Sequence, residues 1–336
     1  MSEILLTYIV PVYNTGLYIL KCLDSLVHQG LADDSFEVLV VDDGSTDNSR
    51  SVVQQFSCRH PQVRLLTQEN KGVSAARNMA LENARGRYVQ FIDSDDYIED
   101  NSMSSLLNRA VEEDLDVLMF GFKWVSGDGT LMKYSYPEDN MASTPVMTGV
   151  EFLSKHGLIQ YVCWYLVKRE HLDNHCLRFN TSLVACEDGA LIPGILLPAK
   201  RVGYTDAAPY CYVSRDDSAT RTIDISRIRR RITSQIDAAA VISATAKGYE
   251  ESSGSKVPAA VLGLMNLYLF FSMTSALTSG CVKETVEHMR RLGLYPFQCI
   301  GPEINYIESK WRYIHRLMMH PRLWHALSKL YLMVKK

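Results

Sequence analysis

Three carboxylates follow a run of apolar residues at Phe91–Asp96, which reads Phe-Ile-Asp-Ser-Asp-Asp. Asp93 and Asp95 are separated by one residue, and Asp96 comes next. Acidic side chains at the end of a buried strand favour a cation there, because hard divalent cations prefer carboxylate oxygens and share their remaining coordination with phosphate. The pattern therefore predicts a site for a divalent metal ion that carries the diphosphate of a nucleotide-activated substrate.

Two further polar segments each follow a predicted strand. The segment Asp42–Asp47 reads Asp-Asp-Gly-Ser-Thr-Asp. A carboxylate here can accept a hydrogen bond from the N3–H of uracil or from a ribose hydroxyl, although a helix cap with solvated acids has the same pattern. The segment Pro11–Asn14 can place Tyr13 against a nucleotide base, or it can be an ordinary strand-to-helix turn. Taken alone, each segment leaves both interpretations open.

A third segment, Glu69–Asn78, places the cations Lys71 and Arg77 around a helix start that Gly72 opens. Such a start suits a diphosphate or nearby carboxylates, and the alternative is a surface helix with a structural arginine. No Gly-x-Gly-x-x-Gly follows the first predicted strand, and the sequence has no Gly-Lys-Ser/Thr of the Walker type. Dinucleotide-dependent redox chemistry and P-loop chemistry are therefore disfavoured.

Short apolar runs alternate with helical patterns through the first 120 residues and must position these segments. Alternation at this spacing predicts a mostly parallel sheet with helices on both faces, in which ligands bind beyond the carboxyl ends of the strands. All the acidic segments follow strands directly, so we expect them at that edge. The predicted strands are Leu5–Val10, Phe36–Val41, Val63–Leu66, Tyr88–Ile92 and Val117–Phe122, and the predicted helices are Leu17–His28, Ser45–Phe56, Ser74–Ala84 and Ser102–Glu113.

The composition of the 336 residues, 47% hydrophobic and 22% charged, is that of a globular protein. A net charge of -3 argues against a nucleic-acid partner. The charge is uneven, because residues 305–336 hold seven Lys and Arg against one acid, a net +6, which leaves -9 for residues 1–304. Eight cysteines without a Cys-x-x-Cys pair fit reduced thiols in the cytoplasm better than disulfides or a zinc site, and the N-terminus lacks the basic lead-in of a signal peptide.

The C-terminal part has a different pattern, which becomes helical beyond Ile223. Val257–Val282 contains no charged residue, and we favour a buried helix of a bundle over a membrane span because it holds Pro, Gly, Asn and many Ser and Thr residues. A basic amphipathic stretch follows Pro321, and it can lie at a membrane interface or pack in the bundle. Its apolar stripe comprises Leu323, Leu327, Leu330, Tyr331 and Val334, with Trp324 alongside.

The order and spacing of the motifs are more specific than any one of them. Pro-Val-Tyr-Asn, Val-Asp-Asp-Gly-Ser-Thr-Asp, Asn-Lys-Gly-Val-Ser-Ala-Ala-Arg-Asn and Phe-Ile-Asp-Ser-Asp-Asp follow one another over the first 125 residues. This arrangement closely resembles the family 2 glycosyltransferases of GT-A fold. The resemblance implies a Rossmann-like mixed α/β sheet and an inverting transfer from a nucleotide-diphospho-sugar, usually UDP-linked, with Mn²⁺ or Mg²⁺.

The resemblance also implies roles for individual residues. Asp43 would contact the uracil with Tyr13 stacked near it, and Asp95 would be the main metal contact with Asp93 as its helper. Lys71 and Arg77 would belong to the basic set near the nucleotide. The expected nucleotide-sugar site comprises Pro11, Tyr13, Asp42, Asp43, Lys71, Arg77, Asp93, Ser94 and Ser218.

The catalytic base of the family lies further along the chain, in a Glu-Asp pair. Cys186-Glu187-Asp188-Gly189 occurs about 90 residues after the acidic run, as the resemblance implies. Inversion by single displacement needs a carboxylate that takes the proton of the acceptor hydroxyl. We expect Asp188 in this role, with Glu187 as the alternative, and a helix N-terminal acid is the structural interpretation of the same pair. The Gln-x-x-Arg-Trp motif of processive synthases is absent, which indicates one sugar per encounter.

We therefore expect a GT-A catalytic domain at residues 1–222, with residues 1–125 binding the nucleotide-sugar and 126–222 the acceptor, and a helical region at 223–336. The expected enzyme is a hexosyl- or N-acetylhexosaminyl-transferase that acts on a growing bacterial surface or capsular glycan, either free or lipid-linked. It would be cytoplasmic or peripheral on the inner face of the membrane, through its basic C-terminal tail. The alternatives are a polyprenyl-phosphate glycosyltransferase and a catalytically silent sugar-nucleotide-binding protein.

Overall fold

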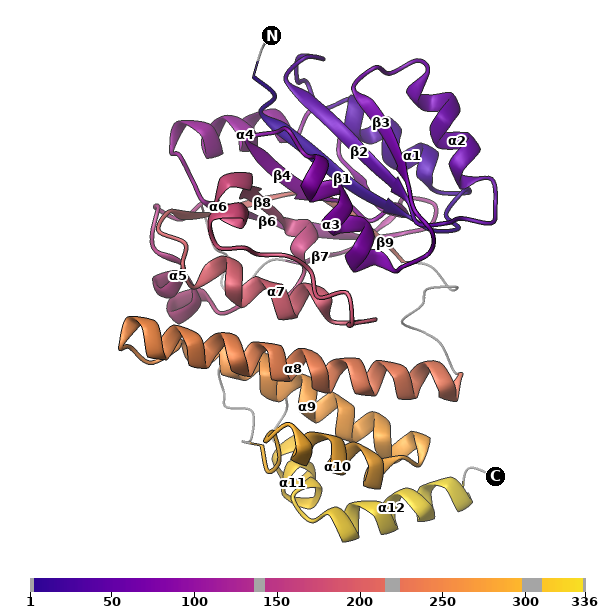
Figure 1. Cartoon of the computed structure of the whole chain (residues 1–336), viewed down its shortest axis with the longest axis vertical. Helices are drawn as coiled ribbons and strands as arrows, with labels where there is room; N and C mark the ends of the chain where they lie inside the picture. The colour runs from indigo at the N-terminus through magenta and orange to yellow at the C-terminus, as the bar shows by residue number, and fades with distance from the viewer. Residues whose placement is uncertain (1–2, 136–142, 215–223, 298–309, 335–336) are drawn as a thin grey trace. The chain divides into compact units, whose positions relative to one another are not determined.

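The computed structural model describes residues 3–135, 143–214, 224–297 and 310–334, and the chain forms two compact units (Figure 1). The first unit contains residues 1–152, 161–181 and 194–216, and the second contains 153–160, 182–193 and 217–336. Each unit is described by itself below. The domain boundary expected at residue 222 stays a prediction.

The first unit is built on one mixed sheet, in which the described residues form nine strands. The strand order is β3-β2-β1-β4-β8-β6-β9-β5, with β7 paired to β6. Strands β3, β2, β1 and β4 are mutually parallel, whereas β8 runs antiparallel between β4 and β6. The strands are β1 (Leu6–Val12), β2 (Phe36–Asp42), β3 (Val63–Thr67), β4 (Tyr88–Phe91), β5 (Tyr97–Ile98), β6 (Val117–Ser126), β7 (Leu131–Ser135), β8 (Tyr165–Lys168) and β9 (Val202–Ser214).

Helices lie on both faces of this sheet (Figure 1). Helix α3 packs on β1 and β2, and α2 packs on β3. Helices α5 and α7 contain residues of both units. The helices are α1 (Ile19–Val27), α2 (Ser49–Ser57), α3 (Val73–Asn83), α4 (Met103–Glu112), α5 (Gly149–His156), α6 (Arg169–Asn174) and α7 (Glu187–Leu196), and a 3₁₀ turn, η1, covers Val162–Trp164.

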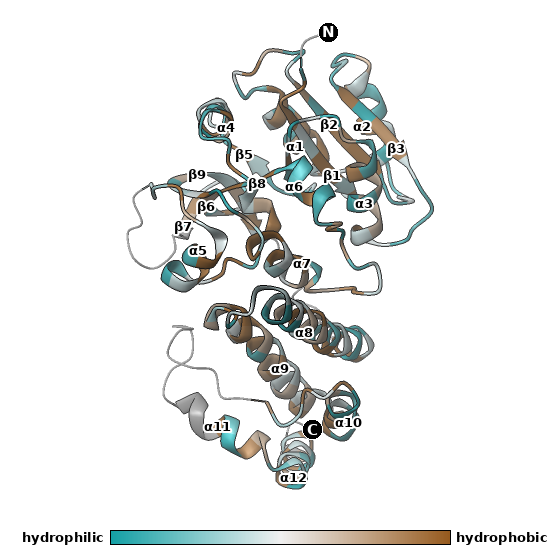
Figure 2. Ribbon diagram, turned by 60° about the vertical axis from the view of Figure 1, so that its left-hand side comes forward, coloured by the Kyte–Doolittle hydropathy of each residue, from teal (hydrophilic) through white to brown (hydrophobic). Residues whose placement is uncertain are grey.

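The predicted strands and helices of the first 125 residues are confirmed, with small shifts at their ends. All seven residues of both β1 and β2 are buried, which is why these strands are largely apolar (brown in Figure 2), with Thr7, Glu37 and Asp42 as their polar members. Helix α2 begins at Ser49 rather than at Ser45. The reason is that the Asn14 side chain accepts hydrogen bonds from the Thr46 and Asp47 amides and holds these residues in a loop.

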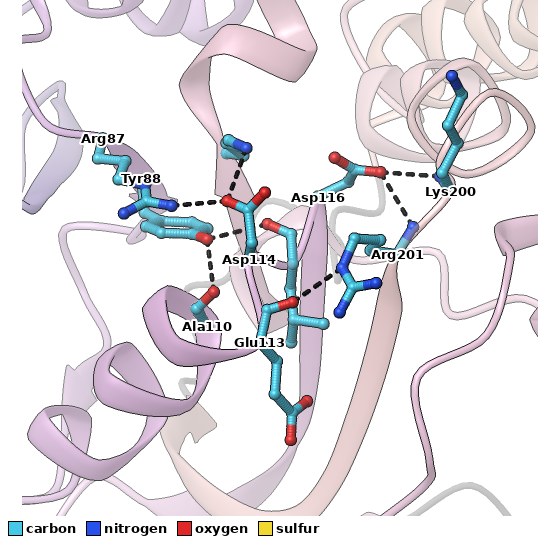
Figure 3. A network of polar contacts seen from close by, with 10 residues as sticks. Arg87, Tyr88, Ala110, Glu113, Asp114, Asp116, Lys200 and Arg201 are labelled. Atoms are coloured by element: carbon cyan, nitrogen blue, oxygen red, sulfur yellow. Dashed lines mark hydrogen bonds and ion pairs between the residues drawn. The ribbon is translucent and has the colours of Figure 1, made fainter.

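A polar network closes the edge of the sheet where β4, β6 and β9 begin (Figure 3). The Asp114 carboxylate accepts hydrogen bonds from Arg87 (2.6 Å) and Lys168 (2.9 Å). The Asp116 carboxylate accepts from the backbone amides of Lys200 (2.8 Å) and Arg201 (3.0 Å). This network joins segments that are distant in sequence at the edge opposite the acidic loops, so the charged groups here belong to the scaffold.

The second unit is helical, as predicted for the region beyond Ile223. Helix α9 packs against α8, α10 and α12, and Figure 2 colours it largely brown. Among the described residues, α9 is the one helix that is long and apolar enough to cross a membrane. Half of its most apolar 18-residue stretch is buried. One such helix is weak evidence, because core helices of soluble proteins share these properties. The helices are α8 (Ile225–Ser253), α9 (Ala259–Ser279), α10 (Val282–Arg291), α11 (Lys310–Met318) and α12 (Pro321–Val334).

Helix α12 is docked on α9 by one of its faces. Trp324 is buried and its indole N–H donates to the Met273 carbonyl (3.1 Å), and Ser328 Oγ donates to the Leu277 carbonyl (2.6 Å). The opposite face stays exposed, with Leu330 at 58%. The predicted stripe of this segment is therefore divided, since Trp324 packs inside the unit while the exposed leucines face outward.

Candidate active site

The acidic loop that follows β4 is fixed to β9 through Asp96. Its buried carboxylate accepts hydrogen bonds from the Tyr210 hydroxyl (2.6 Å) and the Val213 amide (2.8 Å). Burial, followed by the charges of Asp93 and Asp95, raises the pKa of Asp96 well above its usual range. Asp96 therefore serves as the anchor of the loop, while the two preceding acids are only partly buried.

Asp93 and Asp95 are the less buried carboxylates of this loop, and their role as metal ligands stays a prediction. Asp93 Oδ1 is 2.9 Å from Nη2 of the buried Arg77, so one of its oxygens already has a positive partner, and its side chain is 40% exposed. The negative charge of the loop is strong enough to perturb Asp96, which fits a divalent cation. Among the described residues, no group of three or more His, Cys, Asp and Glu side chains is arranged to hold a metal. A metal on Asp95 and Asp93 would thus need further ligands, which a diphosphate and water supply.

The loops after β1 and β2 are joined to each other and to the acidic loop. Asn14, at a φ of 53°, bridges the first two loops, because its side chain accepts from Thr46 N–H (2.8 Å) and its own amide donates to Ser45 Oγ (3.1 Å). Thr15 Oγ1 then donates to the buried Ser94 Oγ (3.0 Å). The three predicted segments therefore meet at one edge of the sheet, as the carboxyl ends of parallel strands require.

Asp43 clasps the start of helix α3. One of its oxygens accepts from the Lys71 amide (2.8 Å) and from Gln68 Nε2 (2.6 Å), and the other accepts from the Gly72 amide (2.9 Å). The carboxylate is buried and satisfies amides that the helix itself leaves without partners. A carboxylate accepts about four hydrogen bonds. Asp43 retains room for one more donor, such as the N3–H of a uracil, and this contact stays a prediction.

The other predicted nucleotide-site residues lie around the same edge. Pro11 is buried within β1, and Tyr13 beyond it is 49% exposed. Asp42 is buried and accepts from the Ser45 amide (3.1 Å), a contact within the loop ahead of α2 that does not cap this helix. The Lys71 side chain is exposed, and only its backbone amide bonds to Asp43. Ser218 lies outside the described residues.

The predicted base segment belongs to the second unit. Cys186, at a φ of 64°, precedes α7, and Glu187 and Asp188 occupy its first turn, where the helix dipole favours acids. A Cβ on Gly189 would lie 1.9 Å from the hydroxyl oxygen of Tyr268, so the glycine permits the close approach of α9. Both interpretations of the Glu-Asp pair therefore remain compatible with its place, and its catalytic role stays a prediction.

Three side chains of these sites carry no sequence signal that would have identified them. Tyr210 holds Asp96, Tyr268 packs on Gly189, and Ser234 bonds to the backbone just before the base segment. Tyr210 is one of several aromatic and apolar residues in strand β9, and Tyr268 lies in α9, a helix without charged residues. Their roles depend on pairings between residues at least 49 positions apart, which local patterns do not encode.

Comparisons with known proteins agree with this arrangement of the first unit. Residues 7–173 match the sequence profile described as Glycosyl transferase family 2. The uncharacterized glycosyltransferase YibD of Escherichia coli is 33% identical over 64% of this chain and 63% of its own length, so the chain spans less than two thirds of this relative. The poly(ribitol-phosphate) beta-glucosyltransferase of Bacillus spizizenii is 28% identical over 63% of this chain and 32% of its own length.

A solved structure extends the likeness to the fold of both units. Residues 1–349 of S. aureus TarS in complex with UDP superpose with a TM-score of 0.69, at 20% identity, over 98% of this chain and 91% of that chain. The same TarS segment has also been solved in complex with UDP-GlcNAc. The predicted α/β fold of GT-A type with a helical C-terminal region is thereby confirmed.

Proposed function

The chain belongs to family 2 of the glycosyltransferases, and we propose that it moves a sugar from a UDP-sugar to a hydroxyl group of a growing glycan. The observation that carries this proposal is the meeting of three loops at one edge of the sheet. One loop supplies Asp93 and Asp95, the two carboxylates expected to bind the metal. Asp43, which accepts from the amides at the start of α3, and the buried Arg77, which donates to Asp93, belong to the same set. A nucleotide diphosphate with a divalent cation satisfies the chemistry of such a set.

Each loop residue has a distinct task in donor binding. Asp95, helped by Asp93, would hold Mn²⁺ or Mg²⁺, which when bound neutralises the charge of the leaving diphosphate. Arg77 fixes the Asp93 carboxylate from the buried side, and Asp96 fixes the loop. The half-exposed ring of Tyr13 is available to a uracil base. The UDP complexes of TarS support a uridine nucleotide as donor.

The transfer itself requires a base. In our proposal Asp188 accepts the proton of the acceptor hydroxyl as the oxygen attacks the anomeric carbon, and the nucleotide diphosphate departs from the opposite side of the sugar. Inversion of the anomeric configuration follows from this single displacement. Glu187 is the alternative base.

The acceptor is proposed to be a bacterial surface glycan. The similarity to the poly(ribitol-phosphate) beta-glucosyltransferase of Bacillus spizizenii supports a polymer of this broad class as acceptor. A polyprenyl phosphate that accepts the sugar directly is the second candidate, and the identity of the radiolabelled product separates the two.

The test of the donor site is an Asp95→Ala variant. We expect it to lose sugar transfer and Mn²⁺-dependent UDP binding, because the main metal contact is removed, while Asp100→Ala, an exposed acid nearby, keeps both. UDP binding is measured by calorimetry with and without Mn²⁺, and donor hydrolysis is measured in the same preparations. Unchanged metal-dependent binding in Asp95→Ala would contradict the assignment, and absence of any donor turnover in the native protein would favour a silent binding protein.

We also propose that the exposed face of α12 contacts an anionic membrane, where a lipid-linked acceptor resides. Leu323, Leu330 and Met333 are 44, 58 and 72% exposed, and the cations Arg322 and Lys329 lie beside them. Apolar side chains flanked by cations are the pattern of helices that lie in a membrane interface.

Vesicle flotation tests this contact. The triple change of Leu323, Leu330 and Met333 to Ser should abolish binding to phosphatidylglycerol-containing vesicles, whereas changing the exposed Ile225, Leu262 and Leu292 to Ser should not. Equal binding of the two triple variants would rule out α12 as the contact.

A further inference from the structure

The start of helix α8 carries an unusual concentration of positive charge. Arg227, Arg229, Arg230 and Arg231 lie within five residues, and the first three are exposed. Within the part of the chain that the structure describes, these three guanidinium groups form no salt bridge. Among the described residues at this end of the helix, the only acid is the N-cap Asp224, whose carboxylate accepts from the Arg227 backbone amide (2.8 Å).

This charge distribution opposes the electrostatics of the helix. The N-terminus of a helix carries a partial positive charge, and cations there are unfavourable. Glu250 and Glu251 lie in the last turn, where acids are equally unfavourable, and no basic residue lies there. Arg227 and Arg230 or Arg231 also repel each other at spacings of three and four residues. Helix stability therefore does not explain the arginines. Cations placed against the helix dipole are typical of a functional surface, because natural proteins depart from local preferences mainly at functional sites.

Three of the four arginines lie on the side of α8 that carries Ser234, the residue that contacts the segment just before the predicted base pair. Ser234 Oγ accepts hydrogen bonds from the amides of Val184 (3.0 Å) and Ala185 (3.1 Å), so this face packs directly before Glu187 and Asp188. Arg227, Arg230 and Arg231 precede Ser234 by seven, four and three residues, which places them on the same side of the helix.

A second observation brings the same arginines close to the segment. Burial raises the pKa of the Cys186 thiol to about 12, and the positive charge of Arg231 acts in the opposite direction on it. Arg231 is thus an electrostatic neighbour of the residue that directly precedes Glu187. All of these groups belong to the second unit.

We propose that this arginine cluster, defined as Arg227, Arg229, Arg230 and Arg231, binds phosphodiester groups of a polyanionic acceptor chain. The proposal rests on the proposed function, since the base segment marks the side of the acceptor hydroxyl. Guanidinium groups bind phosphate oxygens in pairs through parallel hydrogen bonds. Four such groups spread over more than one helical turn suit successive phosphates of a polymer better than one isolated phosphate.

The experiment compares two triple variants of the full chain. Arg227, Arg229 and Arg230 are changed to Gln in one, and the exposed Lys247, Lys256 and Lys283 are changed to Gln in the other, so that both lose the same charge. The probe is a fluorescent synthetic glycerol-phosphate oligomer at low salt. We expect the arginine variant to bind it at least about tenfold more weakly and the lysine variant within about twofold of native, because charge-assisted phosphate contacts are lost only in the first.

Four results would overturn the proposal. One is equal binding of the oligomer by the two triple variants, and another is failure of the native protein to bind it. The third is a matching loss of UDP affinity in the arginine variant, which would assign the arginines to the donor, and inorganic pyrophosphate competing as well as the oligomer would lead to the same conclusion. UDP binding and Mn²⁺-dependent donor hydrolysis are measured separately, so a failure of the proposed function is recognised independently of the oligomer result.

Discussion

The carboxylate of Asp43 offers a test of the site in which structure and sequence assign different roles to one residue. The sequence resemblance assigns it to the uracil, and the structure shows it clasping the start of α3 through three hydrogen bonds. An Asp43→Ala variant removes the clasp. If base recognition were the only role, this variant would be as stable as the native protein.

The expected loss of stability follows from the three bonds. Hydrogen bonds to charged groups contribute about 1.5–3 kcal/mol each. Gln68 is half-buried and can turn to water, so its bond is left out of the sum. The amides of Lys71 and Gly72 remain, and both residues are exposed, which argues for the lower end of that range. Two bonds then give about 3 kcal/mol. Asp43→Asn, which keeps one acceptor oxygen, should lose about half of this.

Urea unfolding and hydrogen exchange of the 68–76 segment measure the effect. The exchange data are needed because two units need not unfold in one step. We expect the α3 start to lose protection in Asp43→Ala, and Asp33→Ala, at an exposed site before β2, to stay within about 0.5 kcal/mol of native. A loss below about 1 kcal/mol together with unchanged protection at Lys71 and Gly72 would refute the clasp.

Further predictions concern the second unit and the buried histidine. Asp188→Asn should keep UDP binding and lose sugar transfer, and near-normal turnover would assign the base elsewhere. Gly189→Ala should destabilise the protein by about 1–3 kcal/mol, since its Cβ would overlap the Tyr268 hydroxyl, and adding Tyr268→Phe should recover part of the loss in urea unfolding. Burial lowers the pKa of His171, so its unfolded form binds protons more readily and stability should fall as the pH drops below about 6.5. His171→Gln should flatten this decline, and an unchanged profile between about pH 5.5 and pH 7.5 would contradict it.

Much of the first unit could be predicted because its determinants are local. Short, mainly apolar runs mark β1 and β2, and acidic segments directly after strands mark the binding edge. The antiparallel insertion of β8 between β4 and β6 could not be predicted, since it pairs Gln90 with Leu166 and no short-range pattern records that pairing. The same limit applies to Asp96, which sequence places beside Asp95 as a supporting acid, and which only the fold joins to Tyr210.

The attachment of Asp96 to β9 has a consequence for biosynthesis. Its partners Tyr210 and Val213 follow it by 114 and 117 residues. During translation the strand that carries the acidic loop emerges long before the strand that holds it, and closing such distant contacts is slow compared with forming helices. The nascent chain therefore exposes an unanchored cluster of acids until β9 leaves the ribosome. If the proposed metal site exists, its affinity should appear only after β9, Val202–Ser214, has been synthesised.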